Sequence, residues 1–358
     1  MKVFRPTRRQ FLGASMLGGL AAASGPWGKL QADVPADTGP TRVVLTHGED
    51  HVDNVFQSLR PLAHEVARAI EDRQVILKPN NVAIDVPLSA TPAECLEGTL
   101  EFLKSIGKLQ GTLIAESAAM GPTFEGFENY GYRRLADKYG VKLVDLDQEK
   151  TETVFVFDEK DFQPHAVRMS RLLLDRQHFF VVSAARIKTH DRVFATLALK
   201  NIVFGAPVKD LGFRWGRGGK PGLMTQKPIA HGSGIYGINY NLFDLAKRLG
   251  PDLAVVDGYQ GMEGNGPVSG TPVEHRVCVA STDWLAADRV AVELMGIDFA
   301  QVGYLNYCAR AGFGEADLEK IEMLGEPIAR HVRRYKLHDK LEDQKMWMTP
   351  PQQPWHTS

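Results

Sequence analysis

Phe179-Phe180-Val181-Val182-Ser183, continued by Ala184-Ala185-Arg186-Ile187-Lys188-Thr189-His190, is the stretch that decides the fold. Its first apolar residues follow one another without the alternation of apolar and polar side chains that marks a strand with one face in water. Such a run is typical of a strand buried on both faces, as in a parallel sheet covered by helices. Val75-Ile76-Leu77 has the same character. We therefore expect an α/β protein with a mainly parallel sheet flanked by helices.

Short apolar runs alternate with longer amphipathic segments between residues 41 and 335, a pattern that predicts a single elaborated α/β domain. The expected strands are 42–46, 75–77, 112–115, 141–145, 179–183, 253–256 and 276–280. Helices are expected over 61–71, 129–139, 193–203, 236–249 and 283–295. Another helix is expected between Thr91, its predicted cap, and Gly107, its predicted end.

The first 32 residues have the composition of a targeting peptide. Arg8 and Arg9 stand in Thr-Arg-Arg-Gln-Phe-Leu, ahead of an apolar stretch that ends at Ala23 and a small residue, Ala32, that suits a cleavage point. We expect a twin-arginine signal peptide over 1–32, with a disordered basic N-terminus as the alternative. The apolar stretch is shorter than the roughly 20 residues of a membrane-spanning helix. We therefore expect it to be cleaved and to leave no stable membrane span.

This segment implies an exported protein. A linker is expected over 33–40, before the α/β domain at 41–335, and a C-terminal tail over 336–358. The twin-arginine route carries proteins that fold before export, so the expected partner during export is the twin-arginine translocase. The expected location is the periplasm or another exported compartment.

Charge is distributed unevenly along the chain. The formal net charge of −1 becomes −6 without residues 1–32, which hold five basic residues and no acidic residue. An acidic chain of this kind lacks the surface expected of a nucleic-acid-binding protein. The segment from Arg186 to Lys227 nevertheless holds nine basic residues against two acidic ones, a net charge of +7. We interpret it as a site for an anionic ligand such as a carboxylate or phosphate, with a solvated basic loop as the alternative.

Polar residues follow four of the predicted strands at the point where each strand ends. They are Lys78-Pro79-Asn80-Asn81, Glu116-Ser117, Arg186 to His190, and Asp257-Gly258. Ligands of open parallel sheets bind outside the carboxyl ends of the strands. We therefore expect these side chains to converge in one pocket, with the solvation of separate loops as the alternative.

Five glycines in fourteen positions mark Asp257 to Gly270, which we interpret as a loop whose backbone amides face a bound anion or substrate. The run lacks the Gly-Lys-Ser/Thr of a phosphate-binding loop and the spacing of a dinucleotide fingerprint. Glu263 within it is a candidate proton carrier, while a solvated glutamate in a tight connection is the alternative. A second glycine-rich run, at 217–222, predicts a mobile lid.

The three cysteines, Cys95, Cys278 and Cys308, stand far apart in the sequence and form no cluster with metal-ligand spacing. We expect them to be small buried side chains, and we expect no iron–sulfur cluster within this chain. The cofactor is otherwise open. Convergent carboxylates beside a histidine favour a divalent metal, for which Glu116 and Asp257 are candidate ligands.

Several short motifs resemble the domain of unknown function 362 family. They are Lys78 to Asn80, Lys188 to His190, Leu199 to Asn201, Met262 to Pro267, and the pattern from Asp283 to Gly296. Together they span most of residues 40 to 300. The resemblance implies an α/β domain and no particular activity. Some relatives carry a ferredoxin-like module with cysteine ligands, which this chain lacks.

These observations lead to one functional hypothesis and two alternatives. The chain is expected to be an enzyme that binds an anionic small molecule at the strand ends. The expected substrate-binding residues are Lys78, Asn80, Asn81, Lys188, Lys200, Asn201 and Asn265, with His190 and Glu263 as catalytic proton carriers. The first alternative is a non-catalytic binding or maturation protein of the periplasm. The second is a partner of an iron–sulfur redox protein.

Overall fold

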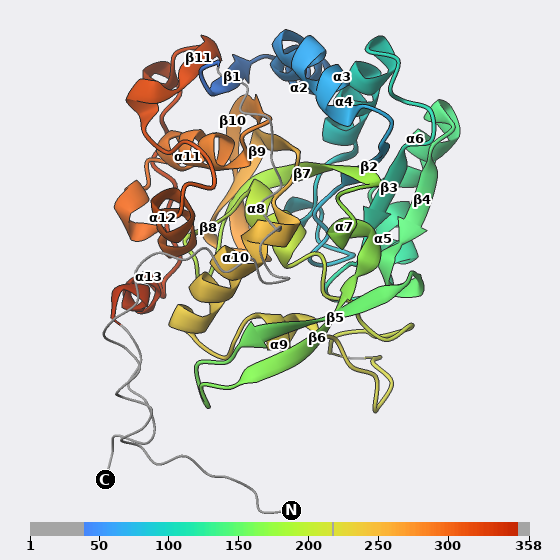
Figure 1. Cartoon of the computed structure of the whole chain (residues 1–358), viewed down its shortest axis with the longest axis vertical. Coiled ribbons are helices and arrows are strands. Elements are labelled where there is room, and N and C mark those ends of the chain that lie inside the picture. The colour runs from blue at the N-terminus through green and yellow to red at the C-terminus, as the bar shows by residue number, and fades with distance from the viewer. Residues whose placement is uncertain (1–38, 217, 350–358) are drawn as a thin grey trace, which may run out of the picture. The chain divides into compact units, whose positions relative to one another are not determined.

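A computed structural model of the chain describes residues 39–216 and 218–349 (Figure 1). From Pro40 onward the chain forms one compact unit. The predicted signal peptide and most of the predicted linker lie outside the described residues. Within the described ranges, no helix combines the length and the apolar character that crossing a membrane requires.

The strands of this unit form one large sheet and one small ribbon. They are β1 (Arg42–His47), β2 (Gln74–Lys78), β3 (Leu113–Glu116), β4 (Lys142–Asp145), β5 (Thr151–Phe157), β6 (Pro164–Ser170), β7 (Phe179–Thr189), β8 (Ala195–Thr196), β9 (Leu253–Asn265), β10 (Ser269–Ser281) and β11 (Glu322–Gly325). The order in the large sheet is β11-β1-β10-β9-β7-β2-β3-β4, and β8 pairs with β7. β5 and β6 pair only with each other among the described strands.

Most neighbouring strands of the large sheet run parallel, which confirms the predicted fold class. The parallel pairs include β9 with β7, β7 with β2, β2 with β3, and β3 with β4. β10 is antiparallel to both of its neighbours, β1 and β9. The chain moves outward from β2 to β3 and β4, and later places β7 on the other side of β2. The carboxyl ends of β2 and β7 therefore form a topological switch point.

Helices cover both faces of this sheet (Figure 1). They are α2 (His51–Leu59), α3 (Ala63–Ile70), α4 (Ala93–Ser105), α5 (Thr123–Asn129), α6 (Tyr132–Tyr139), α7 (Arg171–Leu174), α8 (Ala198–Val203), α9 (Lys227–Ala230), α10 (Ile235–Leu249), α11 (Trp284–Leu294), α12 (Gly303–Arg310) and α13 (Leu341–Gln344). On β2, Val75 and Leu77 belong to the apolar cluster that includes α2, α3, α4 and α6, whereas Ile76 belongs to the cluster of α8, α10, α11 and α12. Burial on both faces explains the uniformly apolar strands.

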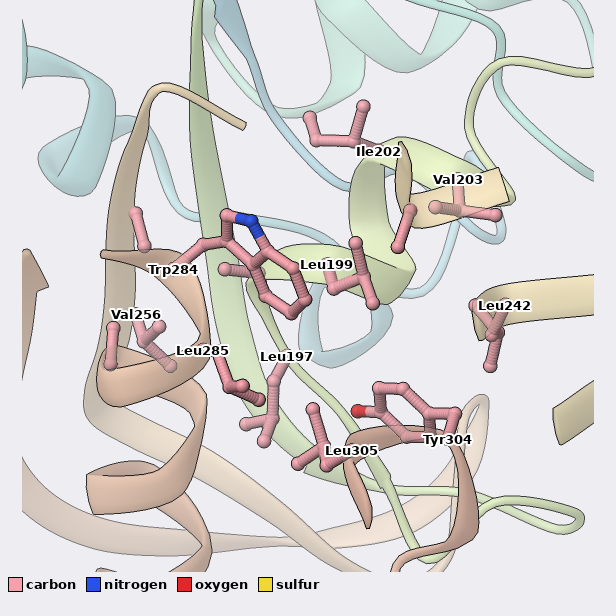
Figure 2. Packing of buried hydrophobic residues seen from close by; sticks show 14 of the residues in the cluster. Leu197, Leu199, Ile202, Val203, Leu242, Val256, Trp284, Leu285, Tyr304 and Leu305 are labelled. Atoms are coloured by element: carbon pink, nitrogen blue, oxygen red, sulfur yellow. The ribbon is translucent and has the colours of Figure 1, made fainter. Parts of the chain in front are cut away.

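The second of these clusters surrounds α8. Figure 2 shows its side chains, among them Leu197, Leu199, Ile202, Val203, Leu242, Val256, Trp284, Leu285, Tyr304 and Leu305. α8 has six residues, fewer than an isolated helix needs for stability in water. Its position therefore depends on this packing against α10, α11 and α12.

The glycine-rich run from Asp257 to Gly270 is not a loop, and that prediction was wrong. β9 and β10 form a long antiparallel hairpin whose paired residues reach Asn265 and Ser269. A Cβ atom on Gly258 would lie 2.8 Å from side-chain carbons of both Ile187 and Val277. The glycine is therefore needed for close approach within the sheet, and the run does not supply a mobile anion-binding turn.

Two further local predictions differ from the structure near the switch point. The expected helix over 193–203 is replaced by β8 and the shorter α8, because Phe194 has a φ of +63° and Leu197, between β8 and α8, is extended with a φ of −136°. Thr91 does not cap α4, since the cap position is Pro92 and makes no side-chain bond. The Thr91 hydroxyl instead donates to Ala184 O at 2.7 Å and accepts from Asn80 N at 2.8 Å, which joins the end of β2 to β7.

Candidate functional site

A cavity of about 700 Å³ lies at the carboxyl ends of β2, β3 and β7. Its polar lining comes from the segments that follow these strands, from α8 and from the region of α9. The lining residues used below are Asn80, Asn81, Glu116, His190, Asp191, Arg192, Thr196, Lys200, Phe204, Lys227 and His231. The predicted convergence at the strand ends therefore holds for β2, β3 and β7.

A buried ion pair lies beneath this cavity. Lys78 is fully buried, and its ammonium donates to Glu116 Oε2 at 2.9 Å, Asn201 Oδ1 at 3.0 Å and Pro79 O at 2.8 Å. Burial lowers the pKa of Lys78, while the charge of Glu116 opposes that shift. All three donors of the ammonium are used within the protein. Lys78 and Asn201 thus join the ends of β2 and β3 to α8 without lining the cavity.

Glu116 also orders the backbone that follows β2 and β3. Its Oε2 accepts from Asn81 N at 3.0 Å, and its Oε1 accepts from Ser117 N at 2.7 Å. The side chain is buried and lines the cavity. With an ammonium and two amides as partners, the carboxylate is largely occupied by the protein itself.

Lys188 supports Asn80 from the end of β7. Its ammonium donates to Asn80 Oδ1 and, at 2.6 Å, to Ser89 O. The side chain is fully buried, and this burial, together with the charge of Lys200, lowers the pKa of Lys188 well below its usual value. Lys188 therefore positions Asn80, which lines the cavity, and does not itself reach the open space.

Lys200 projects from α8 into this cavity. α8 is held at its first turn by Asp288 of α11, which accepts from Ala198 N at 2.8 Å and Leu199 N at 3.1 Å. Leu199 and Ile202, on either side of Lys200, pack into the apolar cluster (Figure 2). The helix thus orients Lys200 through its amide contacts and its buried leucine and isoleucine.

The Lys200 ammonium has an unusual environment for a charged group. The residue is 7% exposed, and its Nζ lies 5.3 Å from the centre of the Phe204 ring. Among the described residues, no hydrogen-bond acceptor or carboxylate pairs with it. Burial lowers the pKa of Lys200 to about 8, an effect that nearby Asp191 opposes and Arg192 reinforces. Lys200 is therefore a buried amine whose bonding capacity is open to a ligand.

Two other lining residues carry buried polar atoms without a partner within the described ranges. They are the side-chain amide nitrogen of Asn81 (Nδ2) and the hydroxyl of Thr196. The two residues are 3% and 2% exposed. Asn81 is otherwise fixed, since its Oδ1 accepts from the Tyr132 hydroxyl at 3.1 Å. Buried polar groups in native proteins are nearly always hydrogen-bonded, so unmet bonding capacity collects around this cavity.

His190 begins a tight turn at the rim of the cavity. His190 N donates to Phe194 O at 2.9 Å, and Gln344 holds the turn by donating to His190 O at 2.9 Å and accepting from Phe194 N at 2.6 Å. Burial and the charge of Lys200 lower the pKa of His190 well below its usual value. The imidazole is therefore neutral at neutral pH. Its Nδ1 lies 3.1 Å from Arg192 N, which is a donor, and also 3.1 Å from Asp191 Oδ1, which is an acceptor.

Lys227 and His231 line the cavity, and the sequence did not single them out as site residues. Lys227 donates to Phe204 O, Gly205 O and Pro207 O at 2.8–3.4 Å, and burial lowers its pKa to about 7. His231 stacks on Phe204 with ring centres 4.4 Å apart. The only sequence signal for Lys227 was its membership of the basic segment, because its place beside the cavity depends on contacts of α9 with Phe204, Gly205 and Pro207 that local sequence does not record.

Three predicted site residues lie elsewhere. Asp257 is buried beside His51, with 3.0 Å between Asp257 Oδ1 and His51 Nε2. Glu263 accepts from Lys336 N at 2.9 Å. Asn265 bonds Asp339 and lines a second, more open cavity of about 440 Å³ at the tip of the β9–β10 hairpin. Met262 of β9 still pairs with Lys188 of β7, and Thr189 Oγ1 donates to Gly264 O at 2.9 Å, so this backbone runs beside Thr189 while the Glu263 and Asn265 side chains contact the C-terminal segment.

Glu116 and Asp257, the candidate metal ligands, belong to different hydrogen-bond groups. Glu116 contacts Lys78 and two amides, whereas Asp257 contacts His51 and Tyr259 N. In the part of the chain that the structure describes, no three His, Cys, Asp or Glu side chains are arranged as ligands of one metal ion. Cys95, Cys278 and Cys308 are all buried, and each has a free thiol.

The fold and the cavity define a mainly parallel α/β protein with a polar cavity at its topological switch point. The chain belongs to the family described as Domain of unknown function (DUF362), whose model matches residues 75–293. All of the cavity-lining residues lie within this range. The thylakoid-associated protein sll1697 of Synechocystis sp. is 26% identical over 270 residues, which are 75% of this chain and 77% of that protein. No solved structure was found to match the chain.

Proposed function

We propose that this protein binds an anionic small molecule in the cavity at the carboxyl ends of β2, β3 and β7. The observation that carries the proposal is the Lys200 ammonium, which belongs to a residue that is 7% exposed and makes no hydrogen bond or ion pair among the described residues, with only the more distant Asp191 charge favouring its protonated form. A buried charge without a partner is costly. A bound anion would supply the missing partner.

The charges around the cavity support this proposal. Lys160, Arg192, Lys200 and Lys227 line it, against the carboxylates of Glu116 and Asp191. Glu116 is already paired with Lys78, so it opposes an incoming anion less than a free carboxylate would. A concave site with an excess of one charge concentrates ions of the opposite charge. Asn81 and Thr196 add unmet hydrogen-bonding capacity for orienting the ligand.

Isothermal titration calorimetry of the purified full-length chain tests the proposal. Succinate, citrate and inorganic phosphate are the probes, and Lys200→Met is the variant. Wild-type protein is expected to bind at least one of these anions, and the variant is expected to bind it about tenfold or more weakly, because an interaction with a buried charge is worth about 1.5–3 kcal/mol.

Lys247→Met is the matched control, since Lys247 lies on the exposed face of α10 and pairs with Asp244 at 3.0 Å. Its anion affinity is expected to equal that of the wild type. Equal anion affinity in the wild type and both variants would show that Lys200 does not contribute to anion binding. Absence of binding to every probe by wild-type protein would count against an anion site in this cavity.

We also propose export through the twin-arginine pathway, on the strength of Arg8 and Arg9 and the apolar stretch that follows them. The association of the Synechocystis relative with thylakoids, stated in its name, is consistent with a protein that leaves the cytoplasm. Fractionation of cells that express wild type and the Arg8→Lys/Arg9→Lys double variant tests this. The variant is expected to accumulate uncleaved inside the cell, and equal export of both proteins would contradict the proposal.

A further inference from the structure

Anion binding alone does not explain why the cation in this cavity is a buried lysine and not an arginine. Arginine is the side chain best suited to recognising a carboxylate or phosphate, because its planar guanidinium binds two oxygens and remains charged. Lysine, in contrast, loses its proton readily when it is buried. Lys200 is 7% exposed, lies over the Phe204 ring, and has no hydrogen-bond partner among the described residues. These are the surroundings in which lysines act as nucleophiles.

We propose that Lys200 is a nucleophilic amine that forms an imine with an oxo acid, a small molecule that carries a carbonyl group and a carboxylate. This inference rests on the proposed anion-binding function, since the carboxylate is the anion that the cavity attracts. It adds the chemical class of the ligand and the covalent step that Lys200 performs.

The step conserves atoms and electrons without an oxidant or a second substrate. The Nζ lone pair forms a C–N bond to the carbonyl carbon, and the π electrons of the C=O bond move to oxygen, which takes up a proton. The proton on that oxygen is one of the two amine protons, and the resulting carbinolamine then loses its hydroxyl group together with the second amine proton as one molecule of water. A C=N bond to Lys200 then replaces the C=O bond.

The surroundings of Lys200 supply what this step requires. Burial and the charge of Arg192 keep the pKa of Lys200 at about 8, so an appreciable fraction of the amine is neutral near pH 7.5. His190 lines the same cavity, and the N–H of its neutral imidazole is a hydrogen-bond donor for the carbonyl oxygen. The Arg192 guanidinium, which also lines the cavity, is the proposed partner of the carboxylate of the oxo acid.

Reductive trapping tests the proposal directly. Full-length protein is incubated with glyoxylate or pyruvate and with sodium cyanoborohydride, which reduces an imine to a stable amine. Mass spectrometry is expected to find one carboxymethyl or carboxyethyl group per chain, located at Lys200 by peptide mapping. At about pH 7.5 this adduct is expected to form roughly a hundredfold faster than adducts at exposed lysines such as Lys247, because a lower pKa leaves more free amine.

Two comparisons separate the imine from simple carbonyl reactivity. Acetaldehyde has the carbonyl group without the carboxylate, and it is expected to modify Lys200 more slowly than glyoxylate. Succinate has the carboxylates without a carbonyl group, and an excess of it is expected to protect Lys200. Lys200→Arg keeps the positive charge but lacks the nucleophile, so it is expected to lose the fast adduct while still binding succinate. Circular dichroism of this variant checks that it folds.

The outcomes distinguish this inference from the proposed function. Modification spread evenly over the lysines of the wild-type chain would contradict the imine proposal. This outcome can be observed with the wild-type protein alone. Succinate binding in that same protein would leave the anion site standing. Loss of both trapping and succinate binding would overturn the two proposals together.

Discussion

Lys78, Lys188 and Lys200 are three buried lysines within one site, and their different partners assign them different tasks. Lys78 donates to three acceptors and Lys188 to two, all of them within the protein. Within the described ranges, the Lys200 ammonium lies over the Phe204 ring and makes no hydrogen bond or ion pair. From sequence alone, all three lysines were predicted to bind the anion. Their partners instead divide them into two that support the cavity and one that faces it.

The pKa of Lys200 predicts how anion binding depends on pH. As the pH rises through about 8, the ammonium loses its proton, and affinity for succinate is expected to fall by up to about tenfold per pH unit. Calorimetry between about pH 6.5 and pH 9.5 measures this. Lys200→Arg is the control, since its guanidinium stays charged in this range. An affinity that falls equally in both proteins would assign the titration to another group.

The Lys78 and Glu116 ion pair predicts a stability effect. Lys78→Met leaves a buried carboxylate without its cation and is expected to lower the free energy of unfolding by about 3–5 kcal/mol. Urea unfolding measures the change, and Lys247→Met serves as the exposed control. Adding Glu116→Gln to Lys78→Met is expected to cost less than the sum of the two single changes. A loss below about 1 kcal/mol would mean that the pair behaves like a surface pair.

At the scale of elements, α8 connects the core to the site. Its apolar residues pack against α10, α11 and α12 (Figure 2), and its first two amides bond Asp288 of α11. Asp288 is fully buried, and burial raises its pKa to about 7 against the effect of these hydrogen bonds. One carboxyl group therefore holds the helix that presents Lys200.

Asp288 predicts a pH-dependent contribution to stability. Its pKa is raised in the folded state, so the contribution is complete below the unfolded value near 4 and is lost as the pH rises through about 7. Asp288→Asn cannot titrate. The wild type is therefore expected to lose stability relative to this variant by roughly 1 kcal/mol per pH unit between about pH 4 and pH 7. Urea unfolding at several pH values measures this difference, and a constant difference would contradict the expectation.

The strands were predictable and the hairpin was not, for one physical reason. Val75-Ile76-Leu77 and Phe179 to Val182 are buried on both faces, and such burial leaves a continuous apolar run in the sequence. The glycines of β9 are explained by contacts with Ile187, Val277 and Tyr335, which come from other parts of the chain. Local sequence does not record such partners, so a run that forms a strand had the composition of a loop.

Contacts with distant parts of the chain also limited how much of the site could be predicted from the sequence. Lys200, Asn80, Asn81, Glu116 and His190 follow strands or lie on α8, and their shared cavity follows from the rule that parallel strands present their carboxyl ends together. Lys227 arrives through a long loop whose course no local pattern predicts. Glu263 follows Met262, which pairs with Lys188 of β7, but its carboxylate accepts from Lys336 N and does not line the cavity.

At the scale of the whole molecule, the C-terminal segment lines the second cavity and holds the turn at the rim of the first. Gly264 N donates to Lys336 O at 2.6 Å, and Asp339 bonds Asn265, so the segment holds the tip of the β9–β10 hairpin. Further along, Gln344 is buried and bonds both ends of the His190 to Phe194 turn. The segment treated as a tail in the sequence analysis thus includes residues that support the cavity rim.

This arrangement predicts that the site depends on residues far from it in sequence. A chain ending at Lys340 loses Gln344 and the buried Trp347, whose indole donates to Gln301 O at 2.7 Å. It is expected to unfold at a lower temperature and to bind succinate at least about tenfold more weakly, because the freed turn leaves a buried N–H and C=O unpaired. A chain ending at Thr349 keeps every contact described above and is the comparison.

Gln344→Ala and Gln344→Glu separate the turn from the rest of the segment. Glutamate still accepts from Phe194 N but cannot donate to His190 O when ionised, so it is expected to lie between the wild type and the alanine variant in succinate affinity. Calorimetry and thermal unfolding together measure both properties. If the chain ending at Lys340 lost stability while Gln344→Ala kept full affinity, the segment would stabilise the fold without shaping the cavity, and the link between the C-terminal region and ligand binding would be wrong.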